Sequence, residues 1–216
     1  MLRLVGGNLN YSSWTLRAWL ALRMTGADFK FHDVQLLTKP GWKERILAFS
    51  GAGLVPILID GPLSIHESLA IGEYLHELHP EAGLWPEDRA LRARGRALCC
   101  ELSSSFHCLR RSLPVNLRAK TSKLVSDERV EADIARICDI WEASLLGTGG
   151  PYLLGKTPTL VDCFFAPTAS RFQTYTVSLP QTAQQYADTV LSLPLLAEVQ
   201  KKALSEPAIQ VFDEKL

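Results

Sequence analysis

Two adjacent serines, Ser12 and Ser13, stand where a short apolar run gives way to a helical pattern, in the stretch NYSSWTLR at residues 10–17. A hydroxyl at the start of a helix can donate a hydrogen bond to an anion, which contributes roughly 1.5–3 kcal/mol, and the helix N-terminus adds roughly 0.3–1 kcal/mol. Serine is also a preferred N-cap residue, because its oxygen accepts a hydrogen bond from an unpaired backbone N–H. The pair therefore allows two roles, anion stabilisation and capping, with one serine in each.

Groups that could bind a ligand also lie at the start of two further predicted elements. Pro56 enters the apolar run ILID, where a proline removes a ladder hydrogen bond unless it lies at the start or edge of the strand. A cis Val55–Pro56 bond would let the backbone of Val55 pair with an extended peptide, and a trans edge proline is the alternative. Glu67 and Ser68 open a helical pattern, so free N–H groups and a hydroxyl can bind a carboxylate while Glu67 faces an ammonium group. Capping alone would also explain this second pair.

The first 80 residues alternate between strand and helix patterns that would position these groups. Gly26 ends the first helical pattern as a natural left-handed terminator, and Pro80 ends the last. Asp60-Gly61 is typical of the centre of a type I′ hairpin turn, whose two central residues both need positive φ. The pattern predicts a βαβ unit, then a hairpin and a helix, over residues 2–7, 12–26, 29–37, 54–66 and 67–80.

After residue 80 the pattern changes to helical periods with little strand character. Pro80, Gly83 and Pro86 punctuate a linker at residues 81–86. We therefore expect an α/β domain over residues 1–80 and an all-α domain over residues 87–216. Its helices are expected near residues 87–113, 124–146, 159–173 and 185–204.

Composition sets the broad limits. The chain has 216 residues, of which 47% are hydrophobic, and its 23 Lys+Arg balance its 23 Asp+Glu, so no bulk field favours nucleic acid or an anionic membrane. No apolar segment approaches the ~18 residues that span a bilayer, and MLRLVGG is too short for a secretory signal, so we expect a cytoplasmic protein. The odd count of cysteines without a CxxC motif indicates reduced, mostly buried thiols. These are Cys99, Cys100, Cys108, Cys138 and Cys163.

Two short motifs match other kinds of site by chance. The stretch GGPYLLGKT, residues 149–157, contains the nucleotide-binding pattern G-x-x-x-x-G-K-S/T, but a phosphate loop follows a strand and opens a helix, and the preceding pattern is helical. Thr159-x-x-Asp162 is better interpreted as a helix-start capping box. HELHP, residues 76–80, places its histidines three apart beside a proline, whereas the zinc-protease helix needs them four apart. We expect no metal.

The ordered set of motifs resembles the cytosolic glutathione transferases. SSWTLRAWLAL is similar to the serine-class motif in which a catalytic serine opens the first helix and an arginine follows five residues later, here Ser12 and Arg17. LVPIL matches the Val-Pro of the family before the third strand, and IHESLAIGEYL matches its Glu/Gln-Ser pair. PTLVD, residues 158–162, is similar to the helix-initiating box of the C-terminal domain. The resemblance spans nearly the whole chain and implies a thioredoxin-like domain followed by an all-helical domain.

The resemblance also implies a function. It indicates an enzyme, a homodimeric glutathione S-transferase of detoxification, with glutathione as co-substrate and a small electrophile as second substrate. Ser12 would be the catalytic residue that stabilises the thiolate, which leaves Ser13 as the cap. The residues that would bind glutathione are Ser12, Val55, Pro56, Glu67 and Ser68. Those that could line the pocket of the second substrate are Trp14, His107, Arg110, Arg111 and Arg118, although His107, Arg110 and Arg111 could instead form a solvated face.

Within the superfamily the substrate stays open. The sequence SLAIGEYL is similar to that of the zeta class, which isomerises maleylacetoacetate. That class, however, has a cysteine two residues after the catalytic serine, where this chain has Trp14. The segment FHCLRRSLPVNLRA also resembles bacterial members whose physiological substrates are mostly unknown. A zeta-like isomerase and a non-catalytic glutathione-binding protein are the alternatives to a transferase.

Overall fold

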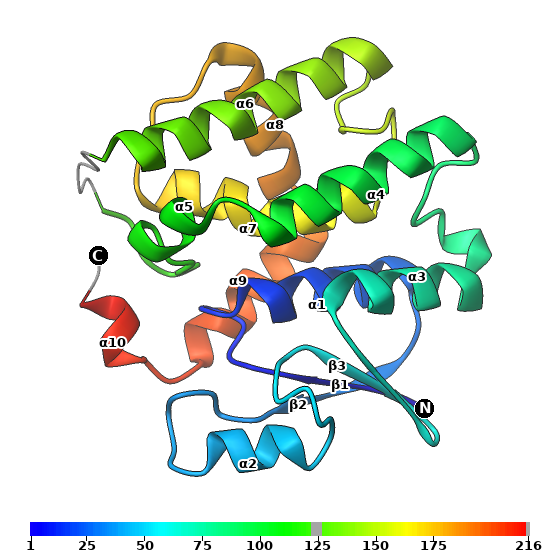
Figure 1. The fold of residues 1–216 in the computed structure, drawn as a ribbon, viewed down its shortest axis with the longest axis vertical. Helices are drawn as coiled ribbons and strands as arrows, with labels where there is room; N and C mark the ends of the chain where they lie inside the picture. The colour runs from blue at the N-terminus through cyan, green and yellow to red at the C-terminus, as the bar shows by residue number, and fades with distance from the viewer. Residues whose placement is uncertain (122–126, 215–216) are drawn as a thin grey trace.

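A four-stranded mixed sheet forms from the first third of the chain (Figure 1). The computed structural model describes residues 1–121 and 127–214. Strand β1 runs parallel to β2 and antiparallel to β3, and β3 pairs antiparallel with β4, which gives the order β2-β1-β3-β4. The strands are β1 (Leu2–Gly6), β2 (Phe29–Asp33), β3 (Ile57–Asp60) and β4 (Leu63–His66). The predicted βαβ unit and hairpin are confirmed.

The hairpin turn lies one residue further along the chain than predicted. Asp60 pairs with Leu63 in the ladder, so the central residues of the turn are Gly61 and Pro62. Gly61 has a φ of 53°, whereas Asp60 does not have a positive φ. Glycine takes a positive φ without steric cost, and the ring of Pro62 holds φ near −65°, so the turn needs a left-handed residue only at its first central position.

Helices cover both faces of the sheet. Helices α1 (Ser13–Thr25) and α3 (Ser68–Leu78) lie on one face, and α2 (Trp42–Leu47) lies on the other (Figure 1). Helix α1 ends at Gly26, which has the predicted left-handed φ of 70°. Helix α2 was not predicted, because six residues are too few to show a helical period. It buries Ile46 in a small apolar cluster with Val5, Val34 and Ile57.

The rest of the described chain is helical. The expected helix at residues 87–113 is two helices, separated at Phe106, whose φ is 60°. The expected helix at 185–204 is also two, because Pro194 starts a new one. Residues 124–126 of the expected helix at 124–146 lie outside the described residues. The elements are η1 (Pro80–Ala82), α4 (Arg89–Ser104), α5 (His107–Ser112), α6 (Glu128–Thr148), α7 (Leu160–Thr174), α8 (Gln181–Leu191), α9 (Pro194–Ser205) and α10 (Gln210–Asp213).

One apolar core joins the two halves, because α1 packs against both α3 and α7. Leu16 and Leu20 of α1 and Phe164 of α7 are buried in it. Helix α7 also approaches α3 closely, since a Cβ on Gly72 would lie 2.3 Å from Cδ2 of Leu160. The division into domains at residues 81–86 stays a prediction.

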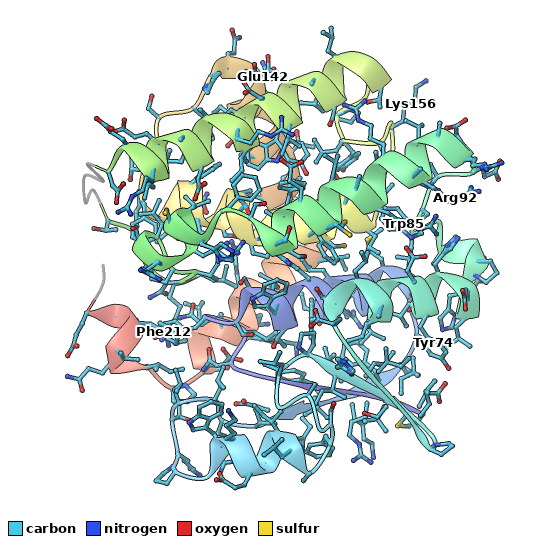
Figure 2. All side chains as sticks on the ribbon, in the orientation of Figure 1. Tyr74, Trp85, Arg92, Glu142, Lys156 and Phe212 are labelled. Carbon is cyan, nitrogen blue, oxygen red and sulfur yellow. The ribbon has the colours of Figure 1, made fainter. Side chains whose placement is uncertain are left out.

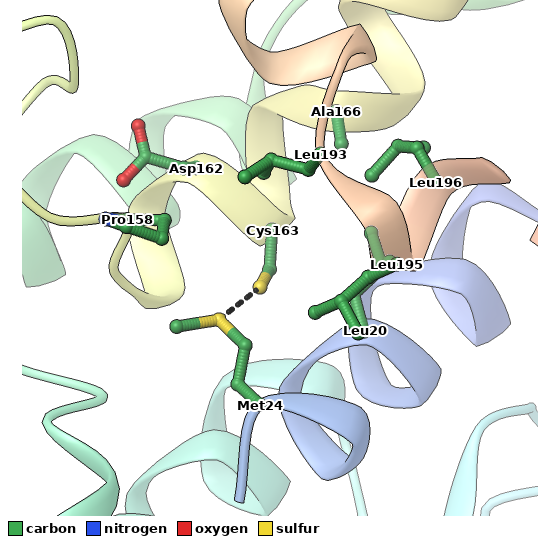
Figure 3. A pocket seen from close by; sticks show the side chains of 9 residues that line it. All are labelled: Leu20, Met24, Pro158, Asp162, Cys163, Ala166, Leu193, Leu195 and Leu196. Carbon is green, nitrogen blue, oxygen red and sulfur yellow. Dashed lines mark hydrogen bonds between the residues drawn. The ribbon is translucent and has the colours of Figure 1, made fainter. Parts of the chain in front are cut away.

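The interface of α1, α7 and α9 encloses a small apolar cavity of about 20 Å³ (Figure 3). Met24 and Cys163 face each other there, with their sulfur atoms 3.1 Å apart. A space of this size holds one water at most, so it is not a substrate site. All five cysteines are free, and burial raises the pKa of the Cys138 thiol to about 11. Within residues 1–121 and 127–214, no helix combines the length and the apolar character needed to cross a membrane.

Candidate active site

A pocket of about 260 Å³ gathers residues from three separate places in the chain. Trp14 comes from the first turn of α1, Val55 and Pro56 precede β3, and Glu67 precedes α3. Leu54 completes the lining. Three of the five residues predicted to bind glutathione therefore lie on one pocket, together with one residue predicted for the second substrate.

The Val55–Pro56 peptide bond is cis, which is the first of the two alternatives that the sequence raised. Pro56 is buried and Val55 is half-buried. Within the described residues, neither the N–H nor the C=O of Val55 has a hydrogen-bond partner. Both groups are free to pair with an extended ligand.

Glu67 and Ser68 lie at the start of α3. Glu67 is exposed and has a φ of 71°, a conformation that is uncommon for a residue other than glycine. Ser68 is only 1% exposed, and its hydroxyl has no hydrogen-bond partner in the described part of the chain. The first N–H groups of a helix have no partner inside the helix. The start of α3 therefore offers hydrogen-bond donors that can bind an anion, beside the Glu67 carboxylate that can face a cation.

Ser12 is the N-cap of α1, so the expectation that Ser13 caps this helix is wrong. Ser12 has extended backbone angles, as an N-cap needs, and its Oγ accepts a hydrogen bond from the N–H of Thr15 at 3.3 Å. Ser13 is already helical, and its Oγ accepts a hydrogen bond from Nη2 of Arg171 at 3.3 Å. Capping uses a lone pair of Ser12, and its hydroxyl hydrogen can point to Oγ1 of Thr15, 2.8 Å away, or to a ligand.

Two buried guanidinium groups lie behind the start of α1. Arg17 is 1% exposed and lies between the rings of Trp14 and Phe164, at 4.2 and 4.9 Å from their centroids. Arg171 is 4% exposed, and burial lowers the pKa of each guanidinium to about 9. In residues 1–121 and 127–214, neither arginine forms an ion pair with a carboxylate. This unbalanced positive charge favours an anion nearby.

The residues predicted for the second substrate lie in different surroundings. Trp14 lines the pocket, and the guanidinium of Arg110 is 6.0 Å from the centroid of its ring. Arg110 also donates to the C=O of Leu102 and contacts His107 at 3.1 Å. Arg111 is exposed on the same short helix. The structure thus brings Arg110 close to Trp14 and leaves Arg111 facing solvent.

Arg118, the fifth of these residues, holds the C-terminal segment to the loop before α1. Its Nη1 donates to the C=O of Glu206 and its Nη2 to the hydroxyl of Tyr11, both at 2.7 Å. The Tyr11 hydroxyl in turn donates to Asp213 at 2.8 Å. Sequence reasoning missed this cluster, because its members are separated by up to 202 positions and no local pattern connects them.

The stretch with the nucleotide-binding pattern has the predicted helical context. Helix α6, rather than a strand, precedes Gly150–Thr157, and α7 begins only at Leu160. Thr159 and Asp162 form the predicted capping box. Among the described residues, no group of three or more His, Cys, Asp or Glu side chains is placed to hold a metal ion.

Comparison with known proteins gives consistent matches over most of the chain. The family model for the glutathione S-transferase N-terminal domain matches residues 8–83, and the model for the C-terminal domain of the same family matches residues 127–192. A probable maleylacetoacetate isomerase from Vibrio cholerae is 33% identical over 201 residues, which cover 87% of this chain and 90% of that protein.

Solved structures share the fold. Maleyl pyruvate isomerase, a bacterial glutathione S-transferase in the zeta class, matches with a TM-score of 0.74 at 24% identity, over 95% of this chain and 100% of that one. A glutathione transferase homologue from Burkholderia with bound glutathione matches with a TM-score of 0.73 at 21% identity, over 95% and 99% of the two chains.

Proposed function

This chain belongs to the glutathione S-transferase family, and from that premise we propose how its site holds glutathione and which electrophiles it accepts. It is an enzyme, a glutathione transferase related to the zeta-class isomerases. The observation that carries the proposal is the single pocket where Trp14, the free backbone of Val55 and Glu67 meet. Bound glutathione in the Burkholderia homologue supports the same ligand here.

Glutathione would lie across the pocket in an extended form. Its γ-glutamyl carboxylate would accept hydrogen bonds from the Ser68 hydroxyl and the first N–H groups of α3, while Glu67 would face its ammonium group. Its cysteinyl backbone would pair with the free N–H and C=O of Val55. Each contact uses a group that has no hydrogen-bond partner in the described chain.

The thiol would be held as a thiolate by Ser12. A free thiol has a pKa near 8.5, and lowering it by about 2 requires roughly 2.7 kcal/mol of preferential stabilisation of the anion. A hydrogen bond to a charged acceptor contributes about 1.5–3 kcal/mol, and the N-terminus of a helix adds about 0.3–1 kcal/mol. Ser12 at the start of α1 can supply both. The positive charge of Arg17 acts in the same direction.

We propose that the electrophile is an anion. Burial is the main cause that lowers the pKa of Arg17 and of Arg171, and the positive charge of Arg110 lowers both further, so the three guanidinium groups lie near one another. No carboxylate of the described chain forms an ion pair with Arg17 or Arg171. A carboxylate on the electrophile would balance this charge. The relationship to a probable maleylacetoacetate isomerase also favours an unsaturated acid.

Two reactions of the thiolate are open for such an acid, and they differ in what happens to glutathione. In transfer, a carbon–sulfur bond forms and stays, so one thiol is consumed for each product. In isomerisation, the thiolate adds to a cis double bond, the resulting single bond rotates, and the thiolate leaves again, so glutathione is regenerated. The Vibrio cholerae relative favours isomerisation, whereas Trp14 at the position of the zeta-class cysteine favours transfer.

Calorimetry and a product assay test these proposals. Glutathione should release or absorb heat and raise the melting temperature by mass action, whereas ATP with magnesium should do neither. No heat and no thermal shift at millimolar glutathione would contradict the proposed ligand. A cis-unsaturated keto acid should then be turned over faster than a neutral aryl halide. Counting free thiols during turnover separates transfer from isomerisation.

We also propose an oligomeric state and a location for this protein. The family resemblance supports a homodimer that acts in the cytoplasm on reactive compounds. Light scattering that gave the monomer mass across micromolar concentrations would contradict the dimer.

A further inference from the structure

The hydroxyl of Thr15 lies 2.8 Å from Oγ of Ser12 and has no part in the function proposed so far. Thr15 is fully buried in the first turn of α1. Its Oγ1 accepts a hydrogen bond from the N–H of Gly7 at 3.0 Å, and its own N–H donates to Oγ of Ser12 at 3.3 Å. A Cβ on Gly6 would lie only 2.2 Å from Cγ2 of Thr15, so β1 fits closely over this methyl group. The Thr15 side chain is therefore fixed in place.

The hydroxyls of Ser12 and Thr15 can share only one hydrogen between them. Each hydroxyl has one hydrogen to donate and two lone pairs to accept. In the structure Ser12 Oγ donates to Thr15 Oγ1, which also accepts from the N–H of Gly7. Rotation of the two hydroxyls reverses this bond, so that Thr15 donates to Ser12. When the hydrogen of Ser12 points to a thiolate, Thr15 is the donor in the pair. Oγ of Ser12 then accepts from both the N–H and the hydroxyl of Thr15.

We propose that Thr15 is a positioning residue that orients and polarises the hydroxyl of Ser12 toward the sulfur of glutathione. The hydrogen bonds then form a chain from the Gly7 N–H through Thr15 and Ser12 to the thiolate, and each bond in such a chain strengthens the next. The inference rests on the proposed role of Ser12. Thr15 itself does not touch the substrate.

A matched pair of substitutions separates the hydroxyl of Thr15 from its methyl group. Thr15→Val keeps the shape beneath Gly6 and removes the hydroxyl, whereas Thr15→Ser keeps the hydroxyl and removes the methyl group. The readout is the thiolate absorbance of bound glutathione against pH, together with kcat and KM. We expect Thr15→Val to raise the pKa of the bound thiol by about 0.5, which leaves about threefold less thiolate at a pH well below that pKa, where the thiol is mostly protonated. Its kcat should fall by a similar factor while the KM for glutathione changes less, and Thr15→Ser should match the wild type.

The double variant Ser12→Ala/Thr15→Val tests whether Thr15 acts through Ser12. If it does, the valine adds no further rise in the thiol pKa once Ser12 is gone. A titration that shifts in Ser12→Ala but not in Thr15→Val would overturn the role of Thr15 alone. An unchanged titration in Ser12→Ala would overturn the proposed role of Ser12 as well. Equal shifts in Thr15→Val and Thr15→Ser would assign the effect to packing and also overturn the inference, and Thr15→Ala replaces Thr15→Val if the latter does not fold.

Discussion

A hydroxyl can accept a hydrogen bond and donate another at the same time, and Ser12 has a use for both. Its oxygen caps α1 by accepting from the Thr15 N–H, and its hydrogen can point to the Thr15 hydroxyl, 2.8 Å away, or to a ligand. Ser13 is already helical, so it does not cap α1, and its oxygen accepts from the buried guanidinium of Arg171. At the scale of single residues, the two serines therefore differ in their hydrogen-bond partners rather than in their chemistry.

The first prediction compares Ser12→Ala with Ser13→Ala. Ser12→Ala should raise the pKa of bound glutathione by about 1 to 2, because a hydrogen bond to a charged acceptor contributes about 1.5–3 kcal/mol. It should also lower the free energy of unfolding by about 0.5–2 kcal/mol through loss of the cap. Ser13→Ala should leave the titration unchanged, although one N–H of Arg171 loses its acceptor. Thiolate absorbance against pH measures the first effect and thermal denaturation the second. A shifted titration in Ser13→Ala alone would mean that the sulfur belongs to Ser13.

The second prediction concerns the charge on the electrophile. Arg110 is near Trp14, whereas Arg111 is exposed one position further on the same helix, so Arg111→Gln is a matched control for Arg110→Gln. Arg110→Gln should raise the KM for an acidic electrophile by about three- to tenfold, since a lost charged contact is worth roughly 1 kcal/mol or more. The KM for a neutral electrophile should change little. Equal changes for both kinds of electrophile would make Arg110 a structural residue.

At the scale of elements, Glu73 connects the two halves of the chain. Its carboxylate on α3 accepts from Nε and Nη2 of Arg96 on α4, at 2.8 and 2.7 Å. The indole N–H of Trp85, labelled in Figure 2, donates to the same carboxylate at 2.9 Å. Partial burial raises the pKa of Glu73, but the hydrogen bonds from Arg96 and Trp85 outweigh burial and hold the pKa below its ordinary value.

The third prediction follows from this lowered pKa. A carboxyl whose pKa is lower in the folded state stabilises the fold above its unfolded pKa of about 4.3, and this contribution is lost as the pH falls through the folded pKa. Glu73→Gln should therefore lower the free energy of unfolding by about 0.5–1 kcal/mol at neutral pH, a value limited by solvent screening. The difference from the wild type should shrink below about pH 4. Denaturant titrations over this pH range measure it, with exposed Glu77→Gln on the same helix as control. A difference that is constant with pH would contradict the ion pair.

Local signals in the sequence predicted most elements, and the failures have physical causes. Gly26 and the Thr159–Asp162 box mark helix ends through their own backbone or side-chain chemistry, so they can be recognised without the fold. Helix α2 is stabilised by burying Ile46 against the sheet, which no six-residue pattern reveals. The apolar period continues across Pro194, so two helices looked like one, although proline is well tolerated at a helix start.

Some residues of the candidate site could also be recognised in the sequence, whereas others could not. Val55, Pro56 and Glu67 are recognisable because each lies where an element starts, and the structure brings them to one pocket. The choice of cap between Ser12 and Ser13 depends on backbone angles, and residue types alone do not determine these. Arg171 contributes its buried charge from α7, far along the chain, so only the packing of α1 on α7 reveals it.

At the scale of the whole molecule, the last described residues return to the start of the chain. The carboxylate of Glu206 accepts the N–H groups of residues 9 and 10, both at 2.9 Å. Phe212, labelled in Figure 2, stacks on the ring of Tyr11 with the ring centroids 5.3 Å apart. These contacts hold the loop that leads directly into Ser12, so the C-terminal segment contributes to positioning the site without lining the pocket at Trp14.

The fourth prediction tests this connection with Tyr11→Phe. The Tyr11 hydroxyl accepts from Arg118 and from the N–H of Ile209, and it donates to Asp213. Removing it leaves a buried N–H without an acceptor, which costs about 1–3 kcal/mol and should lower the melting temperature by roughly 2–10 °C.

The same substitution should loosen the C-terminal segment. Tyr11→Phe should increase proteolytic cleavage after Ser205 and lower kcat, because the loop before Ser12 is no longer held. Tyr152→Phe is the matched control, since no residue of the described chain bonds to the Tyr152 hydroxyl. If Tyr11→Phe melted and was cleaved like the wild type yet lost activity, the Tyr11 hydroxyl would act on the substrate directly. If all three properties were unchanged, the C-terminal segment would have no part in holding the loop that carries Ser12.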